Sequence, residues 1–215
     1  GSDEEYKAIR AYLKDKEGFN ETKENAFVML TPNGIQVDIL PFGDIELDSS
    51  IQLEGTGLTS INVNGFKEVY TAGTEQVELS TGNTFKVATL PSIVLLKLIA
   101  YDDRPEHRQK DATDIANILL HFFDLNENFI YDNHSDLFGN EDATLQNISA
   151  VVIGREIRKI AKENEALVLR LQEILNKHIA AKEYSSFIIL MTKEIDTDVE
   201  AIIDLLKNMQ EGLNA

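Results

Sequence analysis

The spacing of apolar and polar residues changes near the middle of the chain. Before residue 90, short apolar or β-branched runs alternate with turn residues, a pattern typical of β-hairpins. Thr31-Pro32-Asn33-Gly34 and Thr81-Gly82-Asn83 supply the residues that tight turns favour. We therefore expect two hairpins, with strands at residues 26–30 and 35–40, and at 76–80 and 84–88.

Helical spacing marks the other segments. Apolar residues three and four positions apart predict a helix over residues 4–15, which Gly18 ends, and a short helix over residues 64–71. Pro91 is a good first helical residue, and apolar periodicity continues beyond it. We expect helices at residues 91–103, 107–124, 126–137, 144–162, 164–181, 183–193 and 197–212. A single helix over residues 144–181 is the alternative to the break at Glu163-Asn164-Glu165.

These elements predict an α+β fold. Residues 1–90 are expected to form an α/β core with a mixed or antiparallel sheet, and residues 91–215 a helical region. No internal repeat is visible in the sequence.

Charge and composition narrow the function classes. The 215 residues include 37 acidic and 20 basic ones, for a net charge of −17, which repels nucleic-acid phosphates unless a local basic surface exists. The absence of cysteine excludes disulfides and thiolate chemistry and fits a cytoplasmic location. The longest nearly apolar run, Ile93 to Tyr101, is about half of the ~20 residues that a membrane span needs, so we expect no membrane partner.

Asp38 lies in a predicted strand. Period-two alternation puts Gln36, Asp38 and Leu40 on one face, which fixes a carboxylate on a rigid element. Carboxylates held in this way suit hard cations such as Mg²⁺, whereas the alternative is an ordinary solvated strand face. Asp44 and Glu46 are expected to be loop charges.

Lys97 is the polar residue inside the apolar run that follows Pro91. A buried ammonium group requires a partner. Arg104 follows about two helical turns later, so both cations can face the same side and hold an anion such as a polyphosphate. The alternative is a lysine whose stem lies on apolar surface while its head reaches water.

The next helix carries Lys110, Asp111 and Asp114. Lys110 and Asp114 have the spacing of a helical ion pair. Asp111 or Asp114 can anchor Lys97 or Arg104, or act as a general base. Equally, Asp111 near the helix start can serve the helix dipole alone.

Other motifs are absent or structural. Asp196 or Thr197 is expected to cap the last helix, which leaves the pair Asp196 and Asp198 without a metal role. His121, His134 and His178 lack ligand-like spacing, and the sequence contains no phosphate-binding glycine loop, nucleophile elbow or His-Glu-x-x-His motif.

Four segments together resemble one known family. They are Gly34–Gly43, Asn64–Tyr70, Leu90–Ala100 and Arg104–Ile115. Their order and spacing are similar to those of AbiEii-type nucleotidyltransferases, over about residues 4 to 135. The most specific part is Lys-Leu-x-Ala followed by Arg and Lys-Asp-x-x-Asp.

The resemblance implies a partial polymerase-β-like nucleotidyltransferase fold, followed by the helical region. Such proteins transfer a nucleotide from a nucleoside triphosphate with Mg²⁺, in studied cases to tRNA, and include toxins of toxin–antitoxin and phage-defence systems. It implies that Asp38 is the third metal carboxylate and that Lys97, Arg104 and Lys110 bind the substrate. Asp111 and Asp114 would have a binding or base role. A cognate antitoxin is the implied protein partner.

The chain also departs from the family pattern. Members carry a strand and a Gly-Gly or Gly-Ser turn before the helix that corresponds to residues 4–15, and an Asp-x-Asp pair afterwards; this sequence has neither. Asp38 alone cannot supply a two-metal clamp. We therefore expect a fragment or degenerate member that is inactive as written. The alternatives are a non-catalytic module that holds a nucleotide or a protein in the same cleft, and a helical interaction protein using apolar faces after residue 144.

Overall fold

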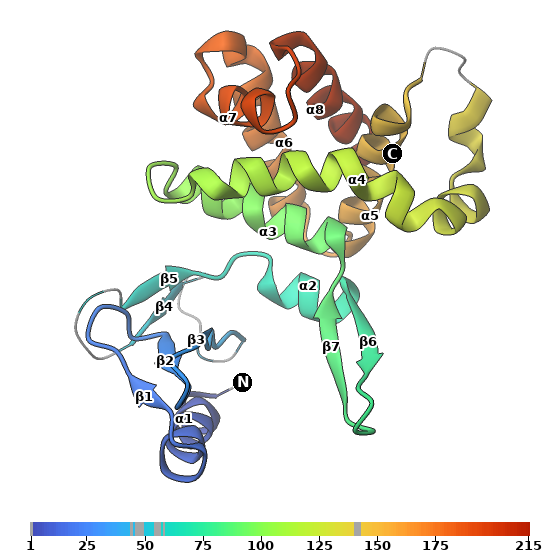
Figure 1. Cartoon of the computed structure of the whole chain (residues 1–215). Coiled ribbons are helices and arrows are strands. Elements are labelled where there is room, and N and C mark those ends of the chain that lie inside the picture. Colours follow the sequence, from blue (N-terminus) through green and yellow to red (C-terminus); the bar gives the residue numbers. More distant parts are fainter. Residues whose placement is uncertain (1, 44, 46–49, 54–56, 58, 140–142) are drawn as a thin grey trace. The chain divides into compact units, whose positions relative to one another are not determined.

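The computed structural model describes residues 2–43, 45, 50–53, 57, 59–139 and 143–215, and Figure 1 shows its helices and strands. Asp44 and Glu46, expected to be loop charges, lie outside these residues. The chain divides into two compact units, residues 1–67 and 68–215, which are described separately here. The expected α+β fold with a helical C-terminal region is confirmed.

In the first unit, helix α1 (Asp3–Glu17) begins at a capping box. The Ser2 hydroxyl accepts the Glu5 N–H, and the Glu5 carboxylate accepts the Ser2 N–H. The helix ends, as expected, at Gly18, whose φ of +71° is a left-handed conformation that glycine adopts without strain.

The first unit also contains two small antiparallel sheets. One has the order β1-β2-β3, with strands Asn20–Glu21, Val28–Leu30 and Gln36–Asp38, so the first expected hairpin forms with shorter strands. The other pairs β4 (Ser50–Gln52) with β5 (Ser60–Asn62). Phe27, Ile51 and Val63 form the buried centre of this unit.

Helix α2 (Phe66–Ala72) crosses the division between the units, and the second unit continues with a hairpin. Strands β6 (Thr74–Glu78) and β7 (Thr84–Ala88) pair antiparallel, as the turn residues predict. The Ser92 hydroxyl donates to the Gly73 carbonyl at 2.6 Å, which ties the base of the hairpin to the following helix. The packing thus groups the hairpin with the helices, whereas the predicted division at residue 90 separates strands from helices.

Eight further helical segments complete the second unit. They are α3 (Leu90–Asp103), α4 (Gln109–Asn133), η1 (Ser135–Gly139), α5 (Leu145–Ile160), α6 (Glu165–Ala181), η2 (Lys182–Tyr184), α7 (Ser186–Glu194) and α8 (Val199–Leu213). Within the described ranges, no helix combines the length and the apolar composition needed to cross a membrane.

Two expected breaks between helices are present, and one expected helix cap is wrong. The expected break between residues 124 and 126 is present as a kink inside α4, where Asn126 has non-helical backbone angles and its side chain donates to the Phe122 carbonyl at 2.9 Å. Helix α4 ends at Asn133, before the expected end at residue 137. The single helix over residues 144–181 is wrong, because the Asn164 side chain caps α6. The last helix is capped by Asp198, not by Asp196 or Thr197.

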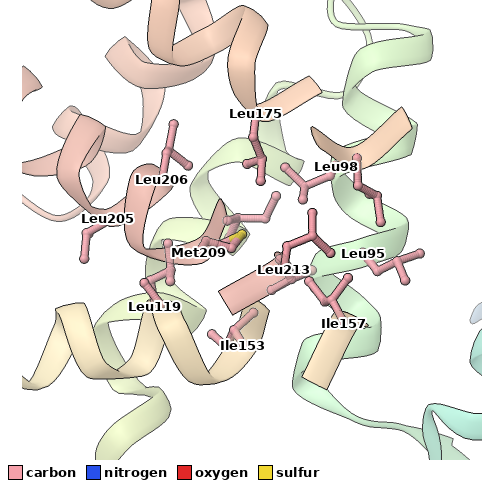
Figure 2. Close-up of a cluster of buried hydrophobic side chains, with 14 of the residues drawn as sticks. Leu95, Leu98, Leu119, Ile153, Ile157, Leu175, Leu205, Leu206, Met209 and Leu213 are labelled. Atoms are coloured by element: carbon pink, nitrogen blue, oxygen red, sulfur yellow. The ribbon is translucent and has the colours of Figure 1, made fainter. Parts of the chain in front are cut away.

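Figure 2 shows part of the main core, in which α3, α4, α5, α6 and α8 contribute buried side chains. Helices α5 and α8 cross at two glycines. A Cβ atom at Gly154 would lie 2.1 Å from the Met209 carbonyl oxygen, and one at Gly212 would lie 2.0 Å from the Val151 carbonyl oxygen. The backbones therefore touch at a separation that no other residue type permits.

Candidate functional site

The second unit brings together three of the predicted site residues. The Lys97 ammonium group donates to Asp111 Oδ1 and to Asp114 Oδ2, at 2.7 Å in both cases. Arg108 Nε donates to the other Asp111 oxygen, also at 2.7 Å. We call these four side chains the Lys97 clamp. The expected anchoring of Lys97 by Asp111 or Asp114 is present, and both carboxylates take part.

Local sequence explains the geometry of the clamp. Lys97 lies on a helix that is apolar almost all round, so only 22% of its side chain is exposed and its charge needs compensation. Asp111 and Asp114 lie three residues apart near the start of α4 and therefore share one face. Asp111 is in the first turn, so it also complements the helix dipole. Its dipole role and its anchoring role coexist.

Electrostatics keep Lys97 charged. Burial lowers the pKa of Lys97, but the hydrogen bonds and negative charges of Asp111 and Asp114 outweigh burial, so the pKa stands above its ordinary value of 10.5. The clamp contains two cations and two anions and is neutral as a whole. Two of the three ammonium N–H groups are used by the carboxylates, and the third is available to a further acceptor.

Arg104 and Lys110 lie on either side of the turn between α3 and α4. Arg104 is half-buried at the end of α3, and Lys110 is exposed in the first turn of α4. Neither side chain forms an ion pair or hydrogen bond with any residue that the structure describes. The expected Lys110–Asp114 pair is therefore wrong, because Asp114 turns toward Lys97 instead. Arg104 and Lys110 therefore carry charges that no described side chain pairs with.

Asp38 belongs to the first unit, on strand β3. Its side chain is exposed, and Oδ1 accepts a hydrogen bond from Gln36 Nε2 at 2.9 Å. The other five predicted site residues belong to the second unit, so the cleft that joins them to Asp38 remains a prediction. Among the described residues, no three His, Asp or Glu side chains gather where they could bind a metal ion.

Sequence reasoning missed Arg108, although its i, i+3 spacing to Asp111 is the signal that would have found it.

Sequence reasoning also missed a buried pair of side chains near the junction of α6 and α7. His178 Nδ1 lies 2.9 Å from the Ser185 hydroxyl, which accepts the Ile188 N–H as the cap of α7. The His178 ring stacks on Phe187, and its Nε2 atom is buried without a hydrogen-bond partner. The two residues are seven positions apart, and the short helix η2 between them brings them together.

Burial lowers the pKa of His178 to about 4, so its ring is neutral near pH 7. His134 is also buried, and burial lowers its pKa although Glu156 opposes the shift. Its Nε2 atom lies 3.3 Å from Glu156 Oε1, within ion-pair range but without hydrogen-bond alignment. Both rings lie inside the fold, which favours structural roles for them.

Comparisons with protein-family models, with curated proteins and with solved structures gave no match.

Proposed function

We propose that the chain is a nucleotidyltransferase-like protein that binds a nucleoside triphosphate with Mg²⁺ through the turn between α3 and α4. The observation that carries the proposal is the Lys97 clamp, a neutral set of ion pairs close in sequence to Arg104 and Lys110, two cations that pair with no described side chain. The family resemblance of these same residues supports it. The acceptor of a transferred nucleotide would be tRNA, in a cytoplasmic toxin–antitoxin or phage-defence setting.

Each group in the turn has an assigned part. Arg104 supplies a planar, permanently charged donor set that matches phosphate oxygens, and Lys110 supplies a second, mobile charge. Lys97 contributes its third N–H. Because Asp111 and Asp114 both accept hydrogen bonds from Lys97, we assign them a positioning role rather than a proton-transfer role.

The family resemblance assigns Asp38 the role of a Mg²⁺ ligand. One Asp38 oxygen accepts from Gln36, and the other makes no hydrogen bond within the described part of the chain. A single carboxylate completed by waters and phosphate oxygens is an ordinary environment for Mg²⁺. When bound, the ion would neutralise triphosphate charge, which a protein of net charge −17 otherwise repels.

A second candidate is a non-catalytic module that holds a nucleotide or a protein, such as an antitoxin, in the same place. One observation favours it over transfer: Asp111 and Asp114 converge on an ammonium group at 2.7 Å, so neither is presented to a metal ion or a hydroxyl. Triphosphate binding without turnover is therefore our expectation for this chain as written.

Titration with a fluorescent nucleoside triphosphate in the presence of Mg²⁺ tests the binding site. We expect the double variant Arg104→Gln, Lys110→Gln to weaken binding about tenfold. The variant loses two charged hydrogen-bond donors, and the effect of each is reduced because solvent screens exposed charges. Lys193→Gln, which removes an exposed and unpaired cation elsewhere in the second unit, is the matched control. Equal affinities for the double variant and the control would refute the phosphate site.

Asp38→Ala tests the metal role in the same assay. We expect it to remove the Mg²⁺-dependent part of the affinity, whereas Asp15→Ala, at an exposed position on α1, should leave it unchanged. Binding that is insensitive to Asp38→Ala excludes Asp38 as a ligand. A radiolabelled transfer assay with tRNA then separates the two candidates, since only the enzyme labels the acceptor.

A further inference from the structure

Strand β3 in the first unit has one paired edge. The sheet order is β1-β2-β3, so β3 is an edge strand in the part of the chain that the structure describes. The Thr31 N–H donates to the Ile35 carbonyl at 2.9 Å, and the Ile39 N–H donates to the Phe27 carbonyl at 2.8 Å. With Met29 opposite Val37, these contacts show that the odd-numbered residues of β3 face β2.

The even-numbered residues therefore direct their backbone groups away from the sheet. Gln36 and Asp38 are exposed, and their N–H and C=O groups have no partner among the described residues. The outward N–H and C=O groups of these two residues can form backbone hydrogen bonds with an added antiparallel or parallel strand. An edge of this kind recognises an extended backbone rather than a folded surface.

An apolar pocket lies where β3 ends. It has a volume of about 470 Å³ and is formed by α1 and residues 39–42, with Ile9, Leu40 and Phe42 among its lining residues. Ile9 is 53% exposed although it is a large apolar side chain. A strand rises about 3.3 Å per residue, so a segment paired with Gln36 and Asp38 reaches the pocket within two or three further residues.

The negative charge of the first unit favours a basic partner at this edge. Residues 1–67 contain twelve acidic and six basic residues. Asp38 projects from the edge strand itself, and Glu4 and Glu5 lie in the first turn of α1. A cross-strand neighbour of opposite charge stabilises an added strand, whereas a second copy of this acidic chain would bring like charges together.

We propose that the free edge of β3 and the adjoining pocket bind an extended segment of a basic partner protein by strand addition. A lysine or arginine of that segment faces Asp38, and an apolar side chain enters the pocket beside Ile9. The backbone edge and the pocket belong to the first unit, and peptide binding is measured without nucleotide, whereas Asp38 is shared with the proposed Mg²⁺ role.

The test uses the whole chain and a fluorescent peptide of about eight residues with alternating lysine and valine, long enough to span a typical strand. Two N-methylated forms of the peptide have the same side chains and charge. One lacks the N–H groups on one edge, and the other lacks them on the opposite edge. We expect one form to bind about tenfold more weakly and the other to bind as the parent does, because only one edge meets β3.

Variants of the protein locate the same edge. Gln36→Pro removes an outward N–H without touching the ladder to β2 and should weaken peptide binding about tenfold, whereas Gln36→Ala keeps the N–H and should bind as the wild type does. Ile9→Glu should weaken binding similarly, and Tyr12→Glu, at an equally exposed position of α1 outside the pocket, should not.

Three results would overturn the proposal. Equal affinities of the two N-methylated peptides would mean that the peptide does not bind through one edge of its backbone, as strand addition requires. Equal affinities of Ile9→Glu and Tyr12→Glu would remove the pocket from the interaction. Sedimentation of the chain alone tests the remaining occupant: a dimer that Gln36→Pro dissociates would identify a second copy instead of a basic partner.

Discussion

The two units of this chain are built on different balances of core and surface. In the first unit, three fully buried apolar side chains, Phe27, Ile51 and Val63, form the centre of two small sheets, and a strand edge stays open. In the second unit, a continuous core joins the long helices, and buried polar pairs are integrated into it. Because its apolar core is much larger, we expect the helical unit to be the more stable of the two.

The largest effect is expected where two helices touch. Gly154→Ala places a Cβ atom 2.1 Å from the Met209 carbonyl oxygen, so α8 must move, and we expect the second unit to lose about 4 kcal/mol. Chemical denaturation followed by circular dichroism measures the loss. Gly139→Ala, which meets no atom within 4 Å, is the control and should change little. Equal stabilities of the two variants would contradict the tight crossing.

Lys97→Met tests whether the second unit depends on its buried ion pairs. Without the ammonium group, Asp111 and Asp114 face each other in a mostly buried site, and we expect a loss of about 3 kcal/mol at pH 7. Adding Asp111→Asn and Asp114→Asn should restore part of the loss, because the uncompensated charges disappear. If Lys97→Met is as stable as the wild type, the ion pairs of the clamp behave as surface ion pairs do and do not stabilise the second unit.

The clamp also predicts how the stability of the second unit changes at alkaline pH. The folded pKa of Lys97 is raised, so its contribution is fully present below pH 10.5 and is lost as the pH rises through the folded pKa. In the Lys97→Met variant, this part of the loss of stability at alkaline pH should be absent.

Ile51→Ala tests the smaller core. Its side chain is fully buried, and its removal should cost the first unit about 2.5 kcal/mol, within the usual range for such truncations. Because the two units have separate cores, hydrogen exchange should quicken in residues 2–43 while α5 and α8 stay protected. Uniform acceleration along the whole chain would show that the units unfold as one.

The smallest expected effect comes from His178. Burial lowers its pKa to about 4, so the unfolded chain takes up its proton first as the pH falls. Its contribution is therefore present above pH 6.5 and lost progressively between pH 6.5 and pH 4, about 2 kcal/mol between pH 7 and pH 5. His178→Gln should flatten this part of the stability profile, and His121→Gln, at an exposed position, should not. A profile unchanged by His178→Gln would exclude the buried ring as its source.

Local signals in the sequence predicted much of the fold. Turn residues located both hairpins, and apolar periodicity located α1, α3 and the helices that follow. Strands β1, β4 and β5 were not predicted, because two or three residues carry too little pattern. The expected break between residues 124 and 126 corresponds to the kink of α4 at Asn126.

The sequence predicted which residues form the candidate site, but not all of the ion pairs among them. The apolar surroundings of Lys97 implied a partner, and the spacing of Asp111 and Asp114 offered two. The helical spacing of Lys110 and Asp114 suggested a local pair, but a buried ammonium competes better for a carboxylate than an exposed one does. The function and the role of Asp38 remain predictions that the binding experiments test.

The glycine crossing of α5 and α8 also limits how this sequence can diverge. Gly154 and Gly212 are far apart in the sequence, yet a side chain at either position meets the backbone of the opposite helix. A side chain at either position would force the two helices apart, so we expect both positions to resist substitution. A helical pair with matched glycines at this separation is therefore a marker by which remote relatives of the second unit can be recognised after the charged residues of the turn have been replaced.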